Sequence, residues 1–241
     1  MIGKTKNVSI ILPTHNEGKS IFHTLSEIEE SLLKIEGYNS KIFVAEDGSR
    51  DDTRQEVDRF ATKASIETVL TTSSERLGYS RGVQRAIRES TEEILVFLDS
   101  DGQYNPEQIR ILLNNLEENS IVCGVRTPRN DSYLRKFYSS CFGLVFKLIF
   151  RLKLQDPSSP FVAANLNEIK FLSNCEIKLG YGFWWEFQVR IAKNNIKVIE
   201  VPVEHRNRIE GKTQVYLLHK LPSIVFTHLK GLIGLKRELS R

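Results

Sequence analysis

Residues 94–103 read Ile-Leu-Val-Phe-Leu-Asp-Ser-Asp-Gly-Gln, and this stretch decides how the rest of the chain is interpreted. Its five apolar residues include β-branched and aromatic types, which is typical of a strand buried on both faces of a parallel sheet. In an extended chain, residues i and i+2 point the same way, so Asp99 and Asp101 are expected to converge where that strand ends. Open α/β sheets bind their ligands at this edge. Two carboxylates there suit Mg²⁺ or Mn²⁺, because these hard cations prefer oxygen ligands. An isolated pair of this kind also serves as a turn or a helix cap.

Short apolar runs alternate with helix-like segments through the first half of the chain. Strands are expected near residues 8–12, 41–45, 66–70, 94–98, 121–125 and 197–203, and helices over residues 19–34, 53–63, 78–89 and 106–118. This alternation predicts an α/β fold with a mostly parallel central sheet, right-handed crossovers and flanking helices. Because parallel strands end at a common edge, the polar residues that follow them are expected to lie together.

The composition is that of an ordinary soluble globular protein, with 40% hydrophobic and 27% charged residues. Residues 126–153 carry seven Lys or Arg against one acid, and residues 204–241 carry eight against three. Such basic stretches suit phosphate-bearing ligands or an anionic membrane. We expect no nucleic acid partner, because the bases are interleaved with aliphatic stretches and no recognised nucleic-acid module is present.

Cysteine usage and hydropathy bear on the compartment. The three cysteines lack metal-binding spacing, which favours reduced, buried thiols in a cytosolic protein. No apolar run is long enough for a transmembrane helix, and the first one is too short for a signal peptide.

Four motifs, in the right order, resemble those of the family 2 glycosyltransferases of the GT-A fold. Residues 8–18, Val-Ser-Ile-Ile-Leu-Pro-Thr-His-Asn-Glu-Gly, resemble the opening of that family. Residues 46–53, Glu-Asp-Gly-Ser-Arg-Asp-Asp-Thr, resemble its nucleotide motif D-D-G-S-x-D-x-T, with Glu46 in place of the first Asp. Residues 77–82 and 97–103 are similar to its glycine segment and its D-x-D metal motif. Gln103 matches the branch of the dolichyl-phosphate and polyprenyl-phosphate mannose synthases.

The resemblance implies an inverting, metal-dependent hexosyltransferase that uses a GDP-linked or UDP-linked sugar. It implies a divalent ion, Mg²⁺ or Mn²⁺, held by Asp99, Asp101 and Gln103 and acting on the leaving diphosphate. It assigns the nucleotide and its phosphates to Pro13, His15, Glu17, Ala45, Asp47, Ser100, Arg126, Arg208, Lys212 and Gln214. Gln214 departs from the Lys that the branch shows there, and Lys212 is the alternative cation.

The acceptor decides whether the reaction needs a base. A polyprenyl phosphate is already an anion and attacks unaided, whereas a saccharide hydroxyl needs a carboxylate to take its proton. Asp156 and Glu186 are the candidates for that catalytic base. We expect polyprenyl phosphate, because Gln103 and residues 208–211 match that branch. The alternatives are transfer to a saccharide hydroxyl in cell-surface glycan synthesis and a non-catalytic nucleotide-sugar-binding protein.

The second half of the chain suggests contact with a membrane surface. Residues 1–214 are expected to form the catalytic domain, and residues 215–241 an amphipathic helical tail. Residues 132–154 predict a helix with a broad apolar face, which suits either the core or a membrane surface. We therefore expect a cytoplasmic protein, peripheral on the cytoplasmic face of the membrane. A homo-oligomer or a membrane-protein partner is left open.

Overall fold

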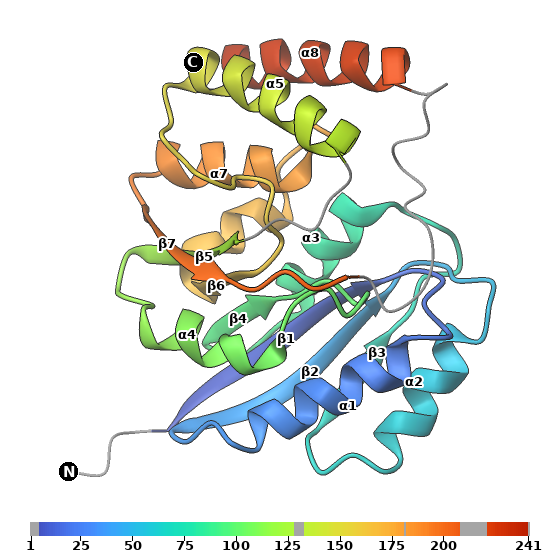
Figure 1. Cartoon of the computed structure of the whole chain (residues 1–241). Coiled ribbons are helices and arrows are strands. Elements are labelled where there is room, and N and C mark those ends of the chain that lie inside the picture. The colour runs from blue at the N-terminus through green and yellow to red at the C-terminus, as the bar shows by residue number, and fades with distance from the viewer. Residues whose placement is uncertain (1–4, 128–132, 181, 208–220, 241) are drawn as a thin grey trace.

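A seven-stranded sheet lies at the centre of the computed structural model, which describes residues 5–127, 133–180, 182–207 and 221–240 (Figure 1). The strands are β1 (Lys6–Thr14), β2 (Tyr38–Glu46), β3 (Thr68–Thr71), β4 (Ile94–Phe97), β5 (Ser120–Arg126), β6 (Val162–Asn165) and β7 (Lys197–Val203). They are ordered β3-β2-β1-β4-β6-β5-β7, and all the pairings are parallel except those of β6 with β4 and β5. The mostly parallel sheet expected from the sequence is confirmed.

Helices cover both faces of this sheet. One face carries α1 (Ile21–Leu32), α2 (Thr53–Ala61), η1 (Pro106–Gln108) and α4 (Ile109–Asn114). The other face carries α3 (Tyr79–Glu89), α6 (Leu166–Ile169), η2 (Lys170–Ser173) and α7 (Phe183–Lys193). Successive strand residues point to opposite faces, so Ile10 and Leu12 join the first core and Ile11 joins the second.

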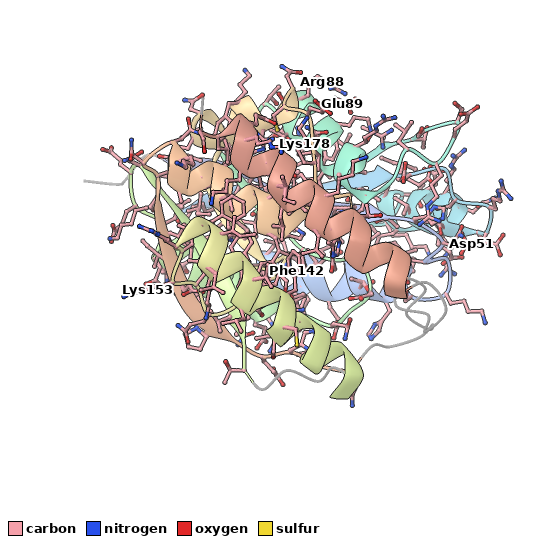
Figure 2. All side chains as sticks on the ribbon, turned by 90° about the horizontal axis from the view of Figure 1, so that it is seen from above. Asp51, Arg88, Glu89, Phe142, Lys153 and Lys178 are labelled. Carbon is pink, nitrogen blue, oxygen red and sulfur yellow. The ribbon has the colours of Figure 1, made fainter. Side chains whose placement is uncertain are left out.

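Two further helices, α5 (Tyr133–Phe150) and α8 (Leu221–Glu238), form an outer layer on α7 (Figures 1 and 2). Phe146 of α5 is fully buried, and its ring centroid lies 4.8 Å from that of Trp185 of α7. Leu144 and Leu148 of the same helix are 62% and 71% exposed. The broad apolar surface predicted for residues 132–154 therefore divides into a core side and an exposed side. Cys141 on this helix is exposed, which corrects the expectation of buried thiols.

The tail predicted from residue 215 onward is described from residue 221, where α8 begins. Leu232 and Leu235 are fully buried in a core that α8 shares with α5 and α7. Gly231 allows this close approach, because a Cβ there would lie 2.6 Å from the carbonyl oxygen of Lys178. In the part of the chain that the structure describes, no helix has the length and apolarity needed to cross a membrane.

Strand β6 was not expected from the sequence. It has only four residues, Val-Ala-Ala-Asn, and lies antiparallel between β4 and β5. Its small side chains are buried on both faces, so it lacks the alternation that marks an exposed strand. The helix predicted over residues 106–118 is also shorter, because η1 and α4 together end at Asn114.

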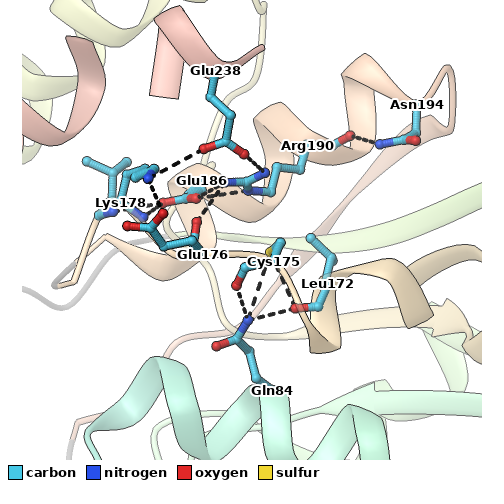
Figure 3. Close-up of polar contacts among 10 residues, drawn as sticks. Gln84, Leu172, Cys175, Glu176, Lys178, Glu186, Arg190, Asn194 and Glu238 are labelled. Carbon is cyan, nitrogen blue, oxygen red and sulfur yellow. Dashed lines mark hydrogen bonds and ion pairs between the residues drawn. The ribbon is translucent and has the colours of Figure 1, made fainter. Parts of the chain in front are cut away.

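A buried ion-pair network joins α7 to α8 and to the loop that precedes α7 (Figure 3). The fully buried Glu186 accepts hydrogen bonds from the backbone N–H groups of Lys178 and Leu179, at 2.8 and 2.7 Å. The Arg190 guanidinium donates twice to the same carboxylate, at 2.8 and 2.7 Å. Arg190 also donates to Glu238 of α8 at 2.8 Å. This network fixes the outer layer to the body of the protein.

We expect Glu186→Gln to lower the free energy of unfolding by about 3 kcal/mol, because Arg190 keeps Glu238 but loses its fully buried carboxylate partner. Urea denaturation of the full chain measures this loss. The matched control is Glu117→Gln, since the Lys197–Glu117 pair is 62% and 59% exposed and its loss should cost about 1 kcal/mol or less. Equal losses in the two variants would contradict a structural role for Glu186.

Candidate functional site

The carboxyl ends of β1, β2 and β4 meet at one edge of the sheet. β1 pairs in parallel with both of the other strands, with Thr14 opposite Glu46 and Ile11 opposite Phe97. Backbone bonds continue the pairing beyond the strands, because the Asp47 N–H donates to the Thr14 carbonyl at 2.9 Å. The Ser100 hydroxyl donates to the Pro13 carbonyl at 3.1 Å. Residues 13–17, 46–49 and 99–103, which lie far apart in the sequence, are thereby brought together.

The His15 side chain is held by both of its ring nitrogens. Its Nδ1 lies 2.8 Å from the Asp47 carbonyl oxygen, and its Nε2 lies 3.2 Å from the Asn16 amide nitrogen. The Asn16 amide oxygen accepts from the Arg50 N–H at 2.9 Å, which leaves its nitrogen to donate to His15. A carbonyl only accepts, so the Nδ1–H of His15 donates to the Asp47 carbonyl.

Glu17 and Ala45, two further residues predicted to contact the nucleotide, lie on the same two strand ends. The Glu17 carboxylate accepts from the Ser20 hydroxyl at 2.9 Å, and its backbone N–H donates to Thr53 at 2.9 Å. Ala45 is fully buried and stands opposite Pro13 in the β1–β2 pairing.

Asp47 organises the glycine segment. Its two carboxylate oxygens accept from the backbone N–H groups of Leu77 and Gly78, at 2.7 and 2.8 Å. Gly48 has a φ of +65°, and a Cβ there would lie 2.7 Å from the Arg76 nitrogen, so only glycine fits. The sequence predicted a nucleotide contact for Asp47, and in the structure its carboxylate binds the backbone of the glycine segment.

Glu46, which replaces the first Asp of the nucleotide motif, is fully buried. Its carboxylate accepts from the Arg54 guanidinium at 2.7 Å and from the Ser49 N–H. The longer side chain therefore reaches α2 and holds the turn of residues 47–49.

The Asp99 and Asp101 carboxylates follow β4 as the sequence predicted. Asp99 Oδ1 accepts a hydrogen bond from the Tyr79 hydroxyl at 2.9 Å. The Tyr79 hydroxyl oxygen in turn accepts from the Trp184 indole N–H at 2.9 Å. Asp101 Oδ1 accepts from the Gln103 backbone N–H at 3.1 Å. The pKa of Tyr79 is raised by desolvation of the tyrosine hydroxyl and by the charge of Asp99. The Tyr79 hydroxyl therefore keeps its proton at neutral pH.

These residues fit a hard divalent cation that is shared with a ligand. The described ranges hold no group of three or more His, Cys, Asp or Glu side chains that could bind a metal by themselves. Mg²⁺ usually binds through one or two carboxylates together with substrate phosphates, which is the donor set that Asp99 and Asp101 offer. Gln103, the third predicted ligand, donates from its side-chain amide to the Arg206 carbonyl at 3.4 Å.

Arg126 and Asp156 pair with each other. Both are buried, and the guanidinium donates twice to the carboxylate, at 2.7 and 2.8 Å, and once to Ser158 at 2.6 Å. This bidentate pair joins the end of β5 to the loop that leads into β6. The sequence predicted a phosphate contact for Arg126 and a base for Asp156, and the structure shows each engaged by the other.

Glu186, the second candidate base, lies in the network between α7 and α8 and is fully buried. Its carboxylate is fully engaged by the Arg190 guanidinium and by the backbone N–H groups of Lys178 and Leu179. Its contacts account for it as a structural acid. Arg208, Lys212 and Gln214 lie outside the described residues.

Tyr79 and Trp184 contact the candidate site through Asp99, and neither was predicted from the sequence. The only signal was the position of Tyr79 inside the glycine segment of residues 77–82. Their contact spans 105 positions of sequence, so only the tertiary structure could reveal it.

Comparison with known proteins gives relatives of consistent type. The chain is 27% identical to a dolichol-phosphate mannosyltransferase of Pyrococcus furiosus, over 86% of this chain and 59% of that protein's length. It is also 27% identical to an undecaprenyl-phosphate mannosyltransferase of Micrococcus luteus, over 86% of this chain and 87% of the relative. Among solved structures, it resembles glucosyl-3-phosphoglycerate synthase of Mycobacterium tuberculosis in complex with Mn²⁺, UDP-glucose and glycerol 3-phosphate. That likeness has a TM-score of 0.70 at 18% identity, over 95% of this chain and 80% of the other.

The decisive match is to a protein family. Residues 9–167 match the family described as Glycosyl transferase family 2. These residues span the first six strands of the sheet and include the three loops that meet at its edge. The chain therefore belongs to glycosyl transferase family 2.

Proposed function

We propose that this protein transfers a hexosyl group from a nucleoside-diphosphate sugar to a polyprenyl phosphate at a membrane surface. The observation that carries the proposal is the convergence of residues 13–17, Asp47 and residues 99–101 at one sheet edge in a family 2 glycosyltransferase. The names of two relatives, which specify mannosyl transfer to dolichol phosphate and undecaprenyl phosphate, support the acceptor.

In this proposal the nucleotide lies over the ends of β1 and β2. Pro13 and Ala45 form its floor, and the His15 ring offers a face on which the base stacks. Nucleotide contacts of Glu17, Asp47 and Ser100 complete this side of the site. For the phosphates we retain Arg126 and, from the sequence alone, Arg208, Lys212 and Gln214.

Asp99 and Asp101, with Gln103, are proposed to hold Mg²⁺ or Mn²⁺ against the diphosphate. When bound, such an ion would neutralise the negative charge that develops on the leaving oxygen. The complex of the Mycobacterium tuberculosis enzyme with Mn²⁺ and UDP-glucose supports a divalent ion in this fold. The protein's own contribution is to orient the two carboxylates before the substrate arrives.

The acceptor follows from the state of the candidate bases. Asp156 is paired with Arg126, and Glu186 is buried in its network, so neither carboxylate is exposed to an incoming hydroxyl. A phosphate acceptor is already ionised and needs no base. This difference favours polyprenyl phosphate over a saccharide hydroxyl.

The outer layer is the proposed membrane contact. Leu144 and Leu148 of α5 and Leu229 and Ile233 of α8 are between 43% and 71% exposed. The two helices lie on the same face of the protein (Figure 2). Bases on this layer include Lys147, Lys230, Lys236 and Arg237. Exposed apolar side chains flanked by bases suit an anionic bilayer, which we propose to be the cytoplasmic face of the cell membrane.

We expect transfer from a UDP-sugar or GDP-sugar only when polyprenyl phosphate and Mg²⁺ or Mn²⁺ are both present. The assay is a panel of radiolabelled donors, scored as product that partitions into organic solvent. Asp99→Asn and Asp101→Asn should each lower turnover more than about 100-fold, because a charge aimed at the leaving group is lost. Asp52→Asn is the matched control, since Asp52 is an exposed acid near the same edge.

Two results of that panel would contradict the proposal. Transfer to a soluble saccharide with no response to polyprenyl phosphate would assign a hydroxyl acceptor. Binding of a nucleotide sugar without any turnover would assign a non-catalytic role.

We expect the protein to float with vesicles that contain anionic lipid, and to do so less at high salt. Leu148→Glu and Ile233→Glu should each weaken this binding about 10-fold or more, because each removes an apolar side chain from the bilayer contact. Leu33→Glu is the control, since Leu33 follows α1 and is 63% exposed away from this layer. Equal binding by all three variants would exclude the α5–α8 surface.

A further inference from the structure

A hydrogen-bond relay connects the D-x-D motif to the helix layer behind it. The Trp184 indole N–H donates to the Tyr79 hydroxyl oxygen at 2.9 Å, and the Tyr79 hydroxyl lies 2.9 Å from Asp99 Oδ1. An indole nitrogen can only donate, so the Tyr79 oxygen must accept this bond. The single hydroxyl proton is then directed at Asp99. The polarity of the relay therefore follows from donor chemistry alone.

The outer end of the relay is rigid. Trp184 is 6% exposed, and its ring contacts Phe97, the last residue of β4, with centroids 5.4 Å apart. Phe183 and Phe187 pack against the same indole, both at 5.1 Å. An indole fixed on three sides cannot follow a displaced tyrosine, so it constrains where the hydroxyl lies.

The Tyr79 end is fixed by its helix. The two N–H groups that precede it are held by the Asp47 carboxylate. Along α3, Gln84 donates to the carbonyls of Leu172 and Cys175, at 2.8 and 2.7 Å (Figure 3). These bonds tie α3 to the segment that leads into α7, so the distance between Tyr79 and Trp184 is set by two packed helices.

We propose that Tyr79, backed by Trp184, is a positioning residue that orients the Asp99 carboxylate for a divalent cation. This inference rests on the proposed function, because it takes Asp99 as a metal ligand. A hydrogen bond from Tyr79 occupies one lone pair of Oδ1 and selects one rotation of the carboxylate. The ordering of Asp99 is thereby completed before the cation and diphosphate bind. Partners of metal ligands typically change metal affinity by about 10-fold to 100-fold when removed.

We expect Tyr79→Phe to raise the Kd of Mn²⁺ about 10-fold, measured by electron paramagnetic resonance of free Mn²⁺ with UDP or GDP present. Trp184→Phe should raise it less. The double variant Tyr79→Phe with Trp184→Phe should bind Mn²⁺ with the same Kd as Tyr79→Phe alone, because the indole acts only through the Tyr79 hydroxyl. Trp185→Phe is the matched control: it removes an indole one position along α7 that packs against Phe146 of α5 instead. Its Kd should stay within about twofold of wild type.

A second measurement separates positioning from general disruption. Because the defect is one of metal affinity, saturating Mn²⁺ should restore the turnover of Tyr79→Phe to near the wild-type value. Phe183→Leu alters the packing of the Tyr79 ring, whose centroid lies 6.4 Å away, and leaves the hydroxyl in place. Because Phe183 also packs against Trp184, this variant should raise the Kd slightly, and far less than Tyr79→Phe does.

The outcomes distinguish this inference from the function it rests on. If wild type binds Mn²⁺ and Tyr79→Phe binds it equally well, the positioning role is wrong and the proposed metal site stands. If Phe183→Leu weakens Mn²⁺ as much as Tyr79→Phe does, the effect is packing and the inference is overturned. If wild type binds no Mn²⁺ with either nucleotide, the metal site and the inference fall together.

Discussion

The parallel pairing of β1 with β2 on one side and β4 on the other is the constraint on which the site depends. It places the ends of three strands at one edge of the sheet, and its register fixes the residue at which each loop begins. The Ser100–Pro13 bond and the Asp47–Thr14 bond extend this order into the loops. A shift of register by one residue would send each side chain to the opposite face, so the acids would no longer converge.

Several buried acids of this protein stabilise its structure. Glu46, Asp47, Asp156 and Glu186 are at most 5% exposed, and each accepts hydrogen bonds from a guanidinium or from backbone N–H groups. A carboxylate removed from water is destabilising unless such partners replace the lost solvent. These acids therefore hold the loops and the outer layer in place, whereas Asp99 and Asp101 are the acids that we propose for the cation.

Helix α7 contacts both the sheet edge and the outer layer of helices. On one side, Trp184 supports the Tyr79–Asp99 contact at the sheet edge. On the other side, Trp185 packs against α5, and Arg190 reaches Glu238 of α8. Adjacent residues of a helix point in different directions, so two successive tryptophans serve two layers. The proposed membrane surface and the proposed metal site are thus held by one rigid element.

Local pattern determined much of this protein from the sequence alone. Runs such as residues 94–98 predict buried strands, their alternation with helices predicts the mostly parallel sheet, and Asp99 and Asp101 follow directly from the end of a strand. Only the tertiary structure decided the insertion of β6, the pairing of Arg126 with Asp156 and the contact of Trp184 with Tyr79. The partners in these contacts come from segments far apart in the chain. Periodicity reports which face of an element is buried, but it carries no information on which distant side chain will satisfy a buried polar group.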